Sequence, residues 1–383
     1  MAVASGLSAA GNYFAQPLLG LLRSELGMAT STATLTVAIS QIGYALGLCL
    51  LVPLGDWYSR RTLSAGLLTA TAVLLAIGGG SPNGGVLLAA TGLVAVTSVG
   101  AQVLVPFAAE LSTDDNRARN IGIVMAGVIA GGILGRAFAG VVADAAGWRS
   151  VYWITAVLLL VLAATILRVL PDSASHREEG ATFGKLMKST ASLLVELPGL
   201  RRPILIAALS MASYITHLST ITLLLDEKPY GYSSAIIGLI GLVGAVGPLW
   251  MPRAGKFVDR GYGKAVLAGG LLFSVLAWAV MIPAQHGQIA WLIAGMILIN
   301  MGQMSALNAT QNACYDLRPE ARSRINAVFM TLFFAGGAIG GTLVPVAWSA
   351  GKWTGVCVMG LVLAGCGLLI AVSTRRRTAT HAA

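Results

Sequence analysis

Uninterrupted apolar stretches recur along the whole chain, and no other feature restricts its fold as strongly. Many reach the roughly 20 residues that a helix needs to cross the hydrocarbon core of a bilayer. Backbone polar groups inside lipid must be hydrogen-bonded within a helix or a closed barrel, and these stretches lack the polar–apolar alternation of a barrel. Charged residues make up only 10% of the chain, against about 25% in soluble domains. The sequence therefore predicts an all-α polytopic membrane protein.

Twelve such stretches can be counted, and each predicts one transmembrane helix. Their approximate bounds are 2–22, 32–55, 63–80, 85–111, 120–144, 150–170, 203–225, 233–252, 265–283, 288–313, 325–349 and 353–373. The N-terminal residues 1–10 contain neither Lys nor Arg. The first stretch therefore lacks the basic region of a cleaved signal peptide, and we expect it to be a retained helix.

Basic residues gather on one side when the chain is threaded through a membrane with its N-terminus inside. Twenty Lys and Arg then fall inside and four outside, and Arg136 alone remains within the membrane. The positive-inside rule thus predicts a multi-pass protein of the inner (plasma) membrane with both termini in the cytoplasm. This distribution explains the net charge of +10 without nucleic acid as a partner, and it favours contact with anionic lipid.

The longest polar interruption, residues 171–203, divides the predicted helices into six and six. We expect an N-terminal six-helix bundle over 1–170, a cytoplasmic linker over 171–202 and a C-terminal six-helix bundle over 203–383. Apolar residues in the later part of the linker have helical spacing and predict a short amphipathic helix along the membrane face; a disordered linker is the alternative. These residues are Phe183, Leu186, Met187, Leu193, Leu194 and Leu197.

The two halves of the chain repeat each other. "RARNIGIVMAGVIAGGILG" (117–135) matches "RSRINAVFMTLFFAGGAIG" (322–340) at an offset of 205 residues. A second, shorter repeat pairs "GDWYSRR" (55–61) with "VDRGYGK" (258–264). Parallel repeats in a polytopic membrane protein predict two bundles that enclose a central site and rock to give alternating access.

This organisation resembles the major facilitator superfamily. In the loop after the second helix, "VPLGDWYSRR" keeps Asp56, Arg60 and Arg61 of the family motif, and "GKFVDRGYGK" keeps Asp259, Arg260 and Lys264 in the second half. The fifth helix resembles the glycine-rich motif of the drug/proton antiporter branch, although Arg136 stands where proline is usual. The resemblance implies two pseudo-symmetric six-helix bundles and secondary active transport. It also implies that the two charged sets latch the bundles; plain surface charge is the alternative.

Polar residues are concentrated in the first, fourth, seventh and tenth helices, which line the central cavity in this family. The candidate cavity residues are Asn12, Tyr13, Gln16, Gln102, Arg136, Tyr214, His217, Asn300 and Gln303. For each Asn or Gln, a hydrogen bond between helices is as good an interpretation as contact with a ligand. Glycines 127, 131 and 135 recur every fourth residue, a pattern that lets another helix approach closely.

A proton-coupling residue is harder to identify, because no carboxylate lies in the middle of a predicted helix. His217 follows Arg202 by fifteen residues, which places it about 22 Å along its helix and within the membrane. Histidine changes charge near neutral pH and is a candidate proton site; a neutral packing residue is the alternative. Three carboxylates near helix ends are the other candidates: Glu110, Asp144 and Asp226.

Arg136 lies about 12 Å from the helix end at Asp144. Exposure to lipid at that depth would cost at least a few kcal/mol, so we expect Arg136 to face protein or the cavity. Three roles stay open. It can neutralise an anionic substrate, take part in a pair that alternates during transport, or donate statically to carbonyls of the facing bundle.

We predict a secondary active transporter that moves a small organic solute, by proton-coupled efflux and as a monomer. Uptake or exchange of an organic anion is the alternative, and a non-transporting sensor on the same scaffold is another. The sequence has no nucleotide-binding G-x-x-x-x-G-K-[ST] motif. It also has no nucleophile–base or metal-ligand cluster. We therefore expect no enzyme activity, no cofactor and no metal.

Overall fold

The computed structural model describes residues 1–113, 116–172, 192–318 and 321–373, without the side chains of residues 56, 117, 118 and 323. Within these ranges the backbone is helical almost throughout and contains no strand. The predicted all-α architecture is therefore confirmed.

The helices of the first half of the chain follow the predicted stretches closely. They are α1 (Ala2–Ala10), α2 (Ala15–Leu26), α3 (Thr30–Leu50), η1 (Val52–Asp56), α4 (Arg60–Gly79), α5 (Gly84–Thr97), α6 (Gly100–Glu110), α7 (Arg117–Ala146) and α8 (Trp148–Val169). The helices of the second half are η2 (Pro198–Leu200), α10 (Arg201–Asp226), α11 (Ser234–Ile240), η3 (Gly241–Ala245), α12 (Val246–Phe257), η4 (Val258–Tyr262), α13 (Gly263–Met281), η5 (Ile282–His286), α14 (Ile289–Tyr315) and α15 (Arg322–Val372).

Nine segments of the described chain are long and apolar enough to cross a membrane. Two of them contain non-helical residues: Ser234–His286 is interrupted at Gly261, and Arg324–Val372 at Gly351 and Lys352. Counting each of these two as a pair gives eleven crossings, and α1 with α2 gives the twelfth, so the twelve predicted stretches are helical.

Three of the predicted helices are interrupted near their middle. Residues 11–14 separate α1 from α2, Ser98 and Val99 separate α5 from α6, and η3 separates α11 from α12. At the first break, the amides of Asn12 and Tyr13 bond carbonyls three residues back, at 3.2 and 2.9 Å. This tighter winding replaces the four-residue step of an α-helix and redirects the chain.

The chain forms two compact units. The first holds α1 to α8 together with Leu225–Glu227 and Gly231–Leu242, and the second holds the rest of the described second half. The sequence predicts domains 1–170 and 203–383, so the difference concerns mainly α11. It arises because α11 packs along α7 and α2, where Gly140 lets the Ser234 backbone approach closely.

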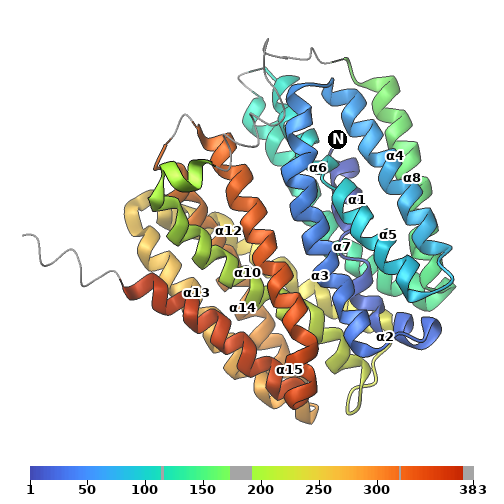
Figure 1. Ribbon diagram of the computed structural model, residues 1–383, viewed down its shortest axis with the longest axis vertical. Coiled ribbons are helices and arrows are strands. Elements are labelled where there is room, and N and C mark those ends of the chain that lie inside the picture. The colour runs from blue at the N-terminus through green and yellow to red at the C-terminus, as the bar shows by residue number, and fades with distance from the viewer. Residues whose placement is uncertain (114–115, 173–191, 319–320, 374–383) are drawn as a thin grey trace, which may run out of the picture. The chain divides into compact units, whose positions relative to one another are not determined.

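Close backbone contacts at glycines hold the first unit together. A Cβ added at Gly131 would lie 1.9 Å from the Gly6 carbonyl oxygen, and one at Gly127 would lie 2.3 Å from that of Ala2. The glycine stripe of α7 therefore packs on α1. In the same unit, α3 packs on α5 and α4 on α8 (Figure 1).

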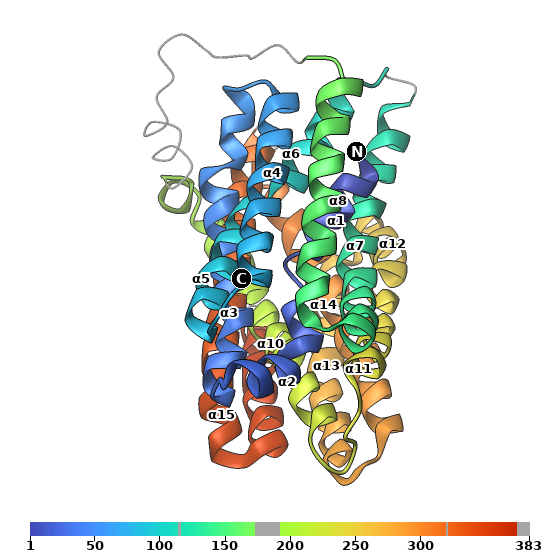
Figure 2. The same cartoon turned by 90° about the vertical axis from the view of Figure 1, so that its right-hand side faces the viewer.

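Glycines also allow close backbone contacts between helices in the second unit. A Cβ at Gly336 of α15 would lie 2.3 Å from the Ala208 carbonyl oxygen of α10, and one at Gly340 would lie 2.2 Å from that of Ala212. The repeat found in the sequence thus repeats in the packing. Helix α13 also packs along α14 (Figure 2), where Gly302 faces the Gly270 carbonyl.

Only the end of the predicted amphipathic helix falls within the described residues. Residues 192–196 are helical, with Leu193 buried, whereas Phe183, Leu186 and Met187 lie outside the described ranges. The Ser192 hydroxyl donates to Glu196 and holds the pKa of that carboxyl below its ordinary value, and Arg318 acts in the same direction at 3.4 Å.

Candidate functional site

The interruptions of the first and fourth predicted helices lie against each other in the first unit. The Ser8 hydroxyl donates to the Ser98 carbonyl oxygen at 2.8 Å, and both residues are fully buried. A Cβ at Gly11 would lie 3.7 Å from the Ser98 hydroxyl oxygen. Backbone carbonyls freed by broken helices are the groups that membrane transporters use near the bilayer midplane.

Arg136 lies beside the first of these interruptions. Its guanidinium carbon stands 5.5 Å from the ring centroid of Tyr13, which is cation–π geometry. Its Nε donates to the Gly132 carbonyl oxygen, one turn earlier on α7, at 3.1 Å. Gly132 makes room for the stack, because a Cβ there would lie 3.3 Å from the Tyr13 ring. Arg136 therefore faces protein, as its cost in lipid requires.

Hydrogen-bond partners are found for only some of the other predicted cavity residues of the first unit. Gln102 donates to the Tyr44 hydroxyl of α3 at 3.3 Å. Asn12 and Gln16 are buried, with 7% and 3% exposed. The Asn12 side-chain oxygen accepts no hydrogen bond from any described residue, although buried polar atoms are usually bonded.

In the second unit, the predicted cavity residues join α10 to α14. The Tyr214 hydroxyl donates to the Asn300 side-chain oxygen at 3.0 Å. The Ser210 hydroxyl donates to the Gln303 side-chain oxygen at 2.6 Å. This second bond matches the Ser8 bond of the first unit, since Gln303 follows Ser98 by the repeat offset of 205 residues.

His217 lies two turns after Ser210 on α10, where the neighbouring helix is α13. It is fully buried, and its ring meets Trp278 of α13 edge-on with 6.2 Å between centroids. Trp278 in turn donates to the Ser213 hydroxyl at 2.8 Å and packs on Gly360. The surroundings of His217 are therefore the interior of the second unit.

The residues predicted to form latches differ in their contacts. Arg60 pairs with Glu110 at 3.0 Å and donates to the Pro106 carbonyl oxygen at 3.2 Å, while Arg61 donates to the Leu167 carbonyl oxygen. The side chain of Asp56 lies outside what the structure describes. In the second unit, the described residues provide no ion pair or hydrogen bond for the last three predicted latch residues, which are Asp259, Arg260 and Lys264.

Each predicted proton-coupling carboxylate has a defined neighbour. Glu110 is paired with Arg60, as above. Asp144 accepts a hydrogen bond from the Ala235 amide at 3.1 Å, at the first turn of α11, where a negative charge is favoured by the helix dipole. The Asp226 carboxylate lies against Gly20, where a Cβ would come within 2.6 Å of it.

Sequence reasoning missed the residues that organise these contacts. The predicted cavity residues did not include Ser8, Ser98 and Ser210, because a lone serine in an apolar helix bonds its own backbone as readily as a neighbour. Trp278 was missed because its own stretch is almost wholly apolar and contains a single serine, Ser274. The repeat offset, applied to hydrogen-bonding residues rather than to glycines, relates Ser98 to Gln303.

Comparison with known proteins agrees with this architecture. Residues 1–341 match the Major Facilitator Superfamily. The chain belongs to this superfamily. It is 35% identical over 370 residues to an uncharacterized transporter, YgaY, of Escherichia coli O157:H7, covering 97% of this chain and 93% of that protein. It is 25% identical over 253 residues to a chloramphenicol resistance protein of Streptomyces lividans, covering 66% and 60%.

A solved structure shows the same fold. The crystal structure of the nucleoside transporter NupG superposes with a TM-score of 0.75 at 16% identity, covering 97% of each chain. The family match and the transporter relatives make the chain a multi-pass membrane transporter.

Proposed function

We propose that this transporter exports a small organic solute by alternating access, in exchange for protons. The observation that carries the proposal is the meeting of two broken helices in the first unit, with Arg136 stacked on Tyr13 beside the break. Interrupted helices that expose backbone and side-chain polar groups are the usual substrate sites of transporters with internal repeats. Asn12, whose buried side-chain oxygen lacks a described donor, supplies an acceptor in the same break.

The division of the eighth predicted helix supports alternating access. Its first part, α11, belongs to the first unit, and α12, after η3, belongs to the second. Gly238 packs on the Arg136 carbonyl, where a Cβ would lie 2.7 Å from the oxygen. Asp144 bonds the start of α11. A rocking motion of the two bundles has to break or remake contacts of this kind.

Efflux rests on likeness to the drug/proton antiporter branch and to the chloramphenicol resistance protein. For coupling, Asp144 and Asp226 are the strongest carboxylate candidates, because both contact segments from the other half of the chain within the first unit. Protonation of Asp144 would remove its charge from the start of α11 and weaken that contact. We further propose a monomer in the inner (plasma) membrane with both termini in the cytoplasm.

Uptake or exchange of an organic anion is the second candidate, and Arg136 favours it. The described residues place no carboxylate within ion-pair distance of this guanidinium. Only its Nε has a hydrogen-bond acceptor there. The two terminal nitrogens can therefore bind a carboxylate or phosphate in a bidentate manner.

A two-step experiment separates the candidates. Purified protein is first screened for solutes that raise its unfolding temperature, and each hit is then tested in proteoliposomes with and without a pH gradient. Proton-coupled efflux predicts that the solute moves up its own concentration gradient when protons flow in the opposite direction down theirs. Anion exchange predicts flux that needs a trans anion and no pH gradient. A hit that binds without any flux would refute both and favour a sensor.

The matched variants for this experiment are Arg136→Gln and Arg149→Gln. Arg149 pairs with Glu25 at 3.0 Å on an exposed helix end, so its loss removes the same charge away from the broken helices. Only Arg136→Gln should abolish flux of an anionic hit. Equal flux in the two variants would remove Arg136 from the transport site.

A further inference from the structure

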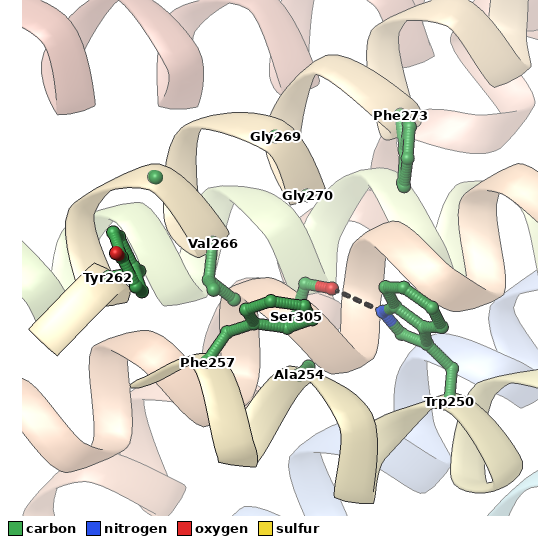
Figure 3. Close-up of a pocket in the computed structure, with 10 residues that line it drawn as sticks. Trp250, Ala254, Phe257, Tyr262, Val266, Gly269, Gly270, Phe273 and Ser305 are labelled. Carbon is green, nitrogen blue, oxygen red and sulfur yellow. Dashed lines mark hydrogen bonds between the residues drawn. The ribbon is translucent and has the colours of Figure 1, made fainter. Parts of the chain in front are cut away.

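An elongated apolar cavity of about 360 Å³ lies within the second unit, between α12, α13 and α14. Figure 3 shows α12 forming one wall and α13 the other. The lining includes Trp250, Ala254 and Phe257 of α12 with Val266, Gly269 and Phe273 of α13. Two polar groups of the lining bond each other, because Trp250 Nε1 donates to the Ser305 hydroxyl at 2.9 Å. A polar solute would therefore find little to bind.

The length of the cavity matches one leaflet of a bilayer. Tyr262 lies at one end, and Trp250 and Phe273 lie at the other (Figure 3). Tyr262 directly precedes α13, and Phe273 lies ten residues after Gly263, the first residue of that helix, so α13 rises about 15 Å between the two ends. The hydrocarbon core of a bilayer is roughly 30 Å thick, so this is about half of it. The lining is thus suited to an extended hydrocarbon chain that enters from the end at Tyr262.

Positive charge is concentrated in the segment that leads from α12 past Tyr262 into α13. The segment from Arg253 to Lys264 holds four basic residues and one acidic residue, a net charge of +3, and all five are exposed. Around α12, Arg253 lies within about 70° of the mean direction of Trp250, Ala254 and Phe257, and its guanidinium donates to the Leu249 carbonyl oxygen at 3.2 Å. By the positive-inside prediction this end faces the cytoplasm, where the leaflet carries anionic lipid.

Two adjacent glycines of α13 have different surroundings: one contacts α14, and the other faces the open space of the cavity. A Cβ at Gly270 would lie 2.6 Å from that of Ser305, so Gly270 lets α13 cross α14 closely. A Cβ at Gly269 would meet nothing within 4 Å, although Gly269 lines the cavity. At the rim, Phe257 and Tyr262 leave 45% and 59% of their surfaces exposed.

We propose that this cavity binds one acyl chain of an anionic phospholipid, whose headgroup is held by the basic residues of the segment from Arg253 to Lys264. The depth, the apolar lining and the charge at the entrance each match one part of that molecule. The site is separate from the broken helices of the first unit, and it does not depend on the proposed solute or coupling ion.

Native mass spectrometry of the full-length protein tests the proposal. The protein is titrated with phosphatidylglycerol or phosphatidylcholine bearing the same chains, and the retained lipid is counted. Wild type should retain one phosphatidylglycerol at about tenfold lower concentration than phosphatidylcholine, because basic residues attract the anionic headgroup. Gly269→Leu fills the cavity and should weaken retention at least about tenfold, the loss expected for two buried methylenes. The double variant Arg253→Gln with Lys256→Gln should lose the headgroup preference and keep the chain.

Gly66→Leu is the control, since a Cβ at Gly66 of α4 also meets nothing within 4 Å but lines no described cavity. It should bind lipid as wild type does. A phosphatidylglycerol with a photoreactive group near the chain end should label peptides containing Trp250 or Phe273 in the wild-type protein, which tests the site without any substitution. Unchanged retention in Gly269→Leu, equal loss in Gly66→Leu, or labelling elsewhere would overturn the proposal. If the wild-type protein forms a dimer that is lost in Gly269→Leu while lipid binding is unchanged, the cavity is instead the contact surface for a second copy of this chain.

Discussion

Replacing Gly131 by alanine should destabilise the first unit strongly, although the change adds a single methyl group. The added Cβ would stand 1.9 Å from the Gly6 carbonyl oxygen, and ordinary van der Waals contact begins at 3.4 Å. The two helices would have to separate by about 1.5 Å. No side chain can rotate away, because the atoms in conflict belong to backbone. Overpacking typically costs about 1–3 kcal/mol, and we expect the upper end here.

The same helix contains a control position at which a glycine-to-alanine substitution should not lower the stability. Gly122 is exposed on α7, and a Cβ there meets nothing within 4 Å. Gly122→Ala should be neutral or stabilise by about 0.5–1 kcal/mol, because alanine loses less conformational entropy than glycine in a helix. Gly336→Ala in the second unit should behave as Gly131→Ala does, since its Cβ would lie 2.3 Å from the Ala208 carbonyl oxygen.

Thermal unfolding at one fixed heating rate measures these differences. At about 2 °C per kcal/mol for a chain of this size, Gly131→Ala should lower the midpoint by about 6 °C and Gly122→Ala should not lower it. Fluorescence-detected size exclusion of heated detergent extracts gives the same ranking without purification. Equal midpoints for the two variants would refute the assignment of the glycine stripe to the α1–α7 contact.

Four further predictions concern topology and mechanism. Cysteines introduced at positions 178 and 228 should react from opposite sides of the membrane, and reaction of both with an impermeant external reagent would refute the twelve-helix threading. Asp56→Asn should slow solute flux in a folded protein, and unchanged flux would make Asp56 plain surface charge. If His217 and not one of the carboxylates carries the proton, His217→Gln should abolish the effect of a pH gradient while preserving solute exchange; full proton-driven flux in this variant would leave His217 as packing for α10. Arg136→Met should lose flux but at most about 2 kcal/mol of stability, the upper range of the lost cation–π contact, so an unstable yet active variant would make this arginine a packing residue.

The fold could be predicted from the sequence because the bilayer leaves few choices. Apolar length fixes where helices cross, and the distribution of Lys and Arg predicts their direction. The glycines at 127, 131 and 135 predicted a close helix contact, and the structure supplies the partner, α1. Spacing alone could not choose it, since any helix without bulky side chains at the contact fits such a stripe.

The candidate site was predicted only in part. The polar residues of the first, fourth, seventh and tenth helices were recognised, but not the breaks at 11–14 and at Ser98. A break depends on groups far away in the sequence that satisfy the freed backbone, here the hydroxyl of Ser8, and local propensity does not contain that information. The edge-on contact between His217 and Trp278 was hidden for the same reason.

The two sides of α7 have different neighbours, and this difference connects the packing to the proposed mechanism. Gly127, Gly131 and Gly135 face α1, which belongs wholly to the first unit. The set formed by Arg136, Gly140 and Asp144 lies about 180° around the helix at 3.6 residues per turn, and its neighbour is α11. Because α11 continues through η3 into α12 of the second unit, any motion between bundles has to act on this second side. Substitutions on the glycine side should therefore change stability, and those on the arginine side should change flux.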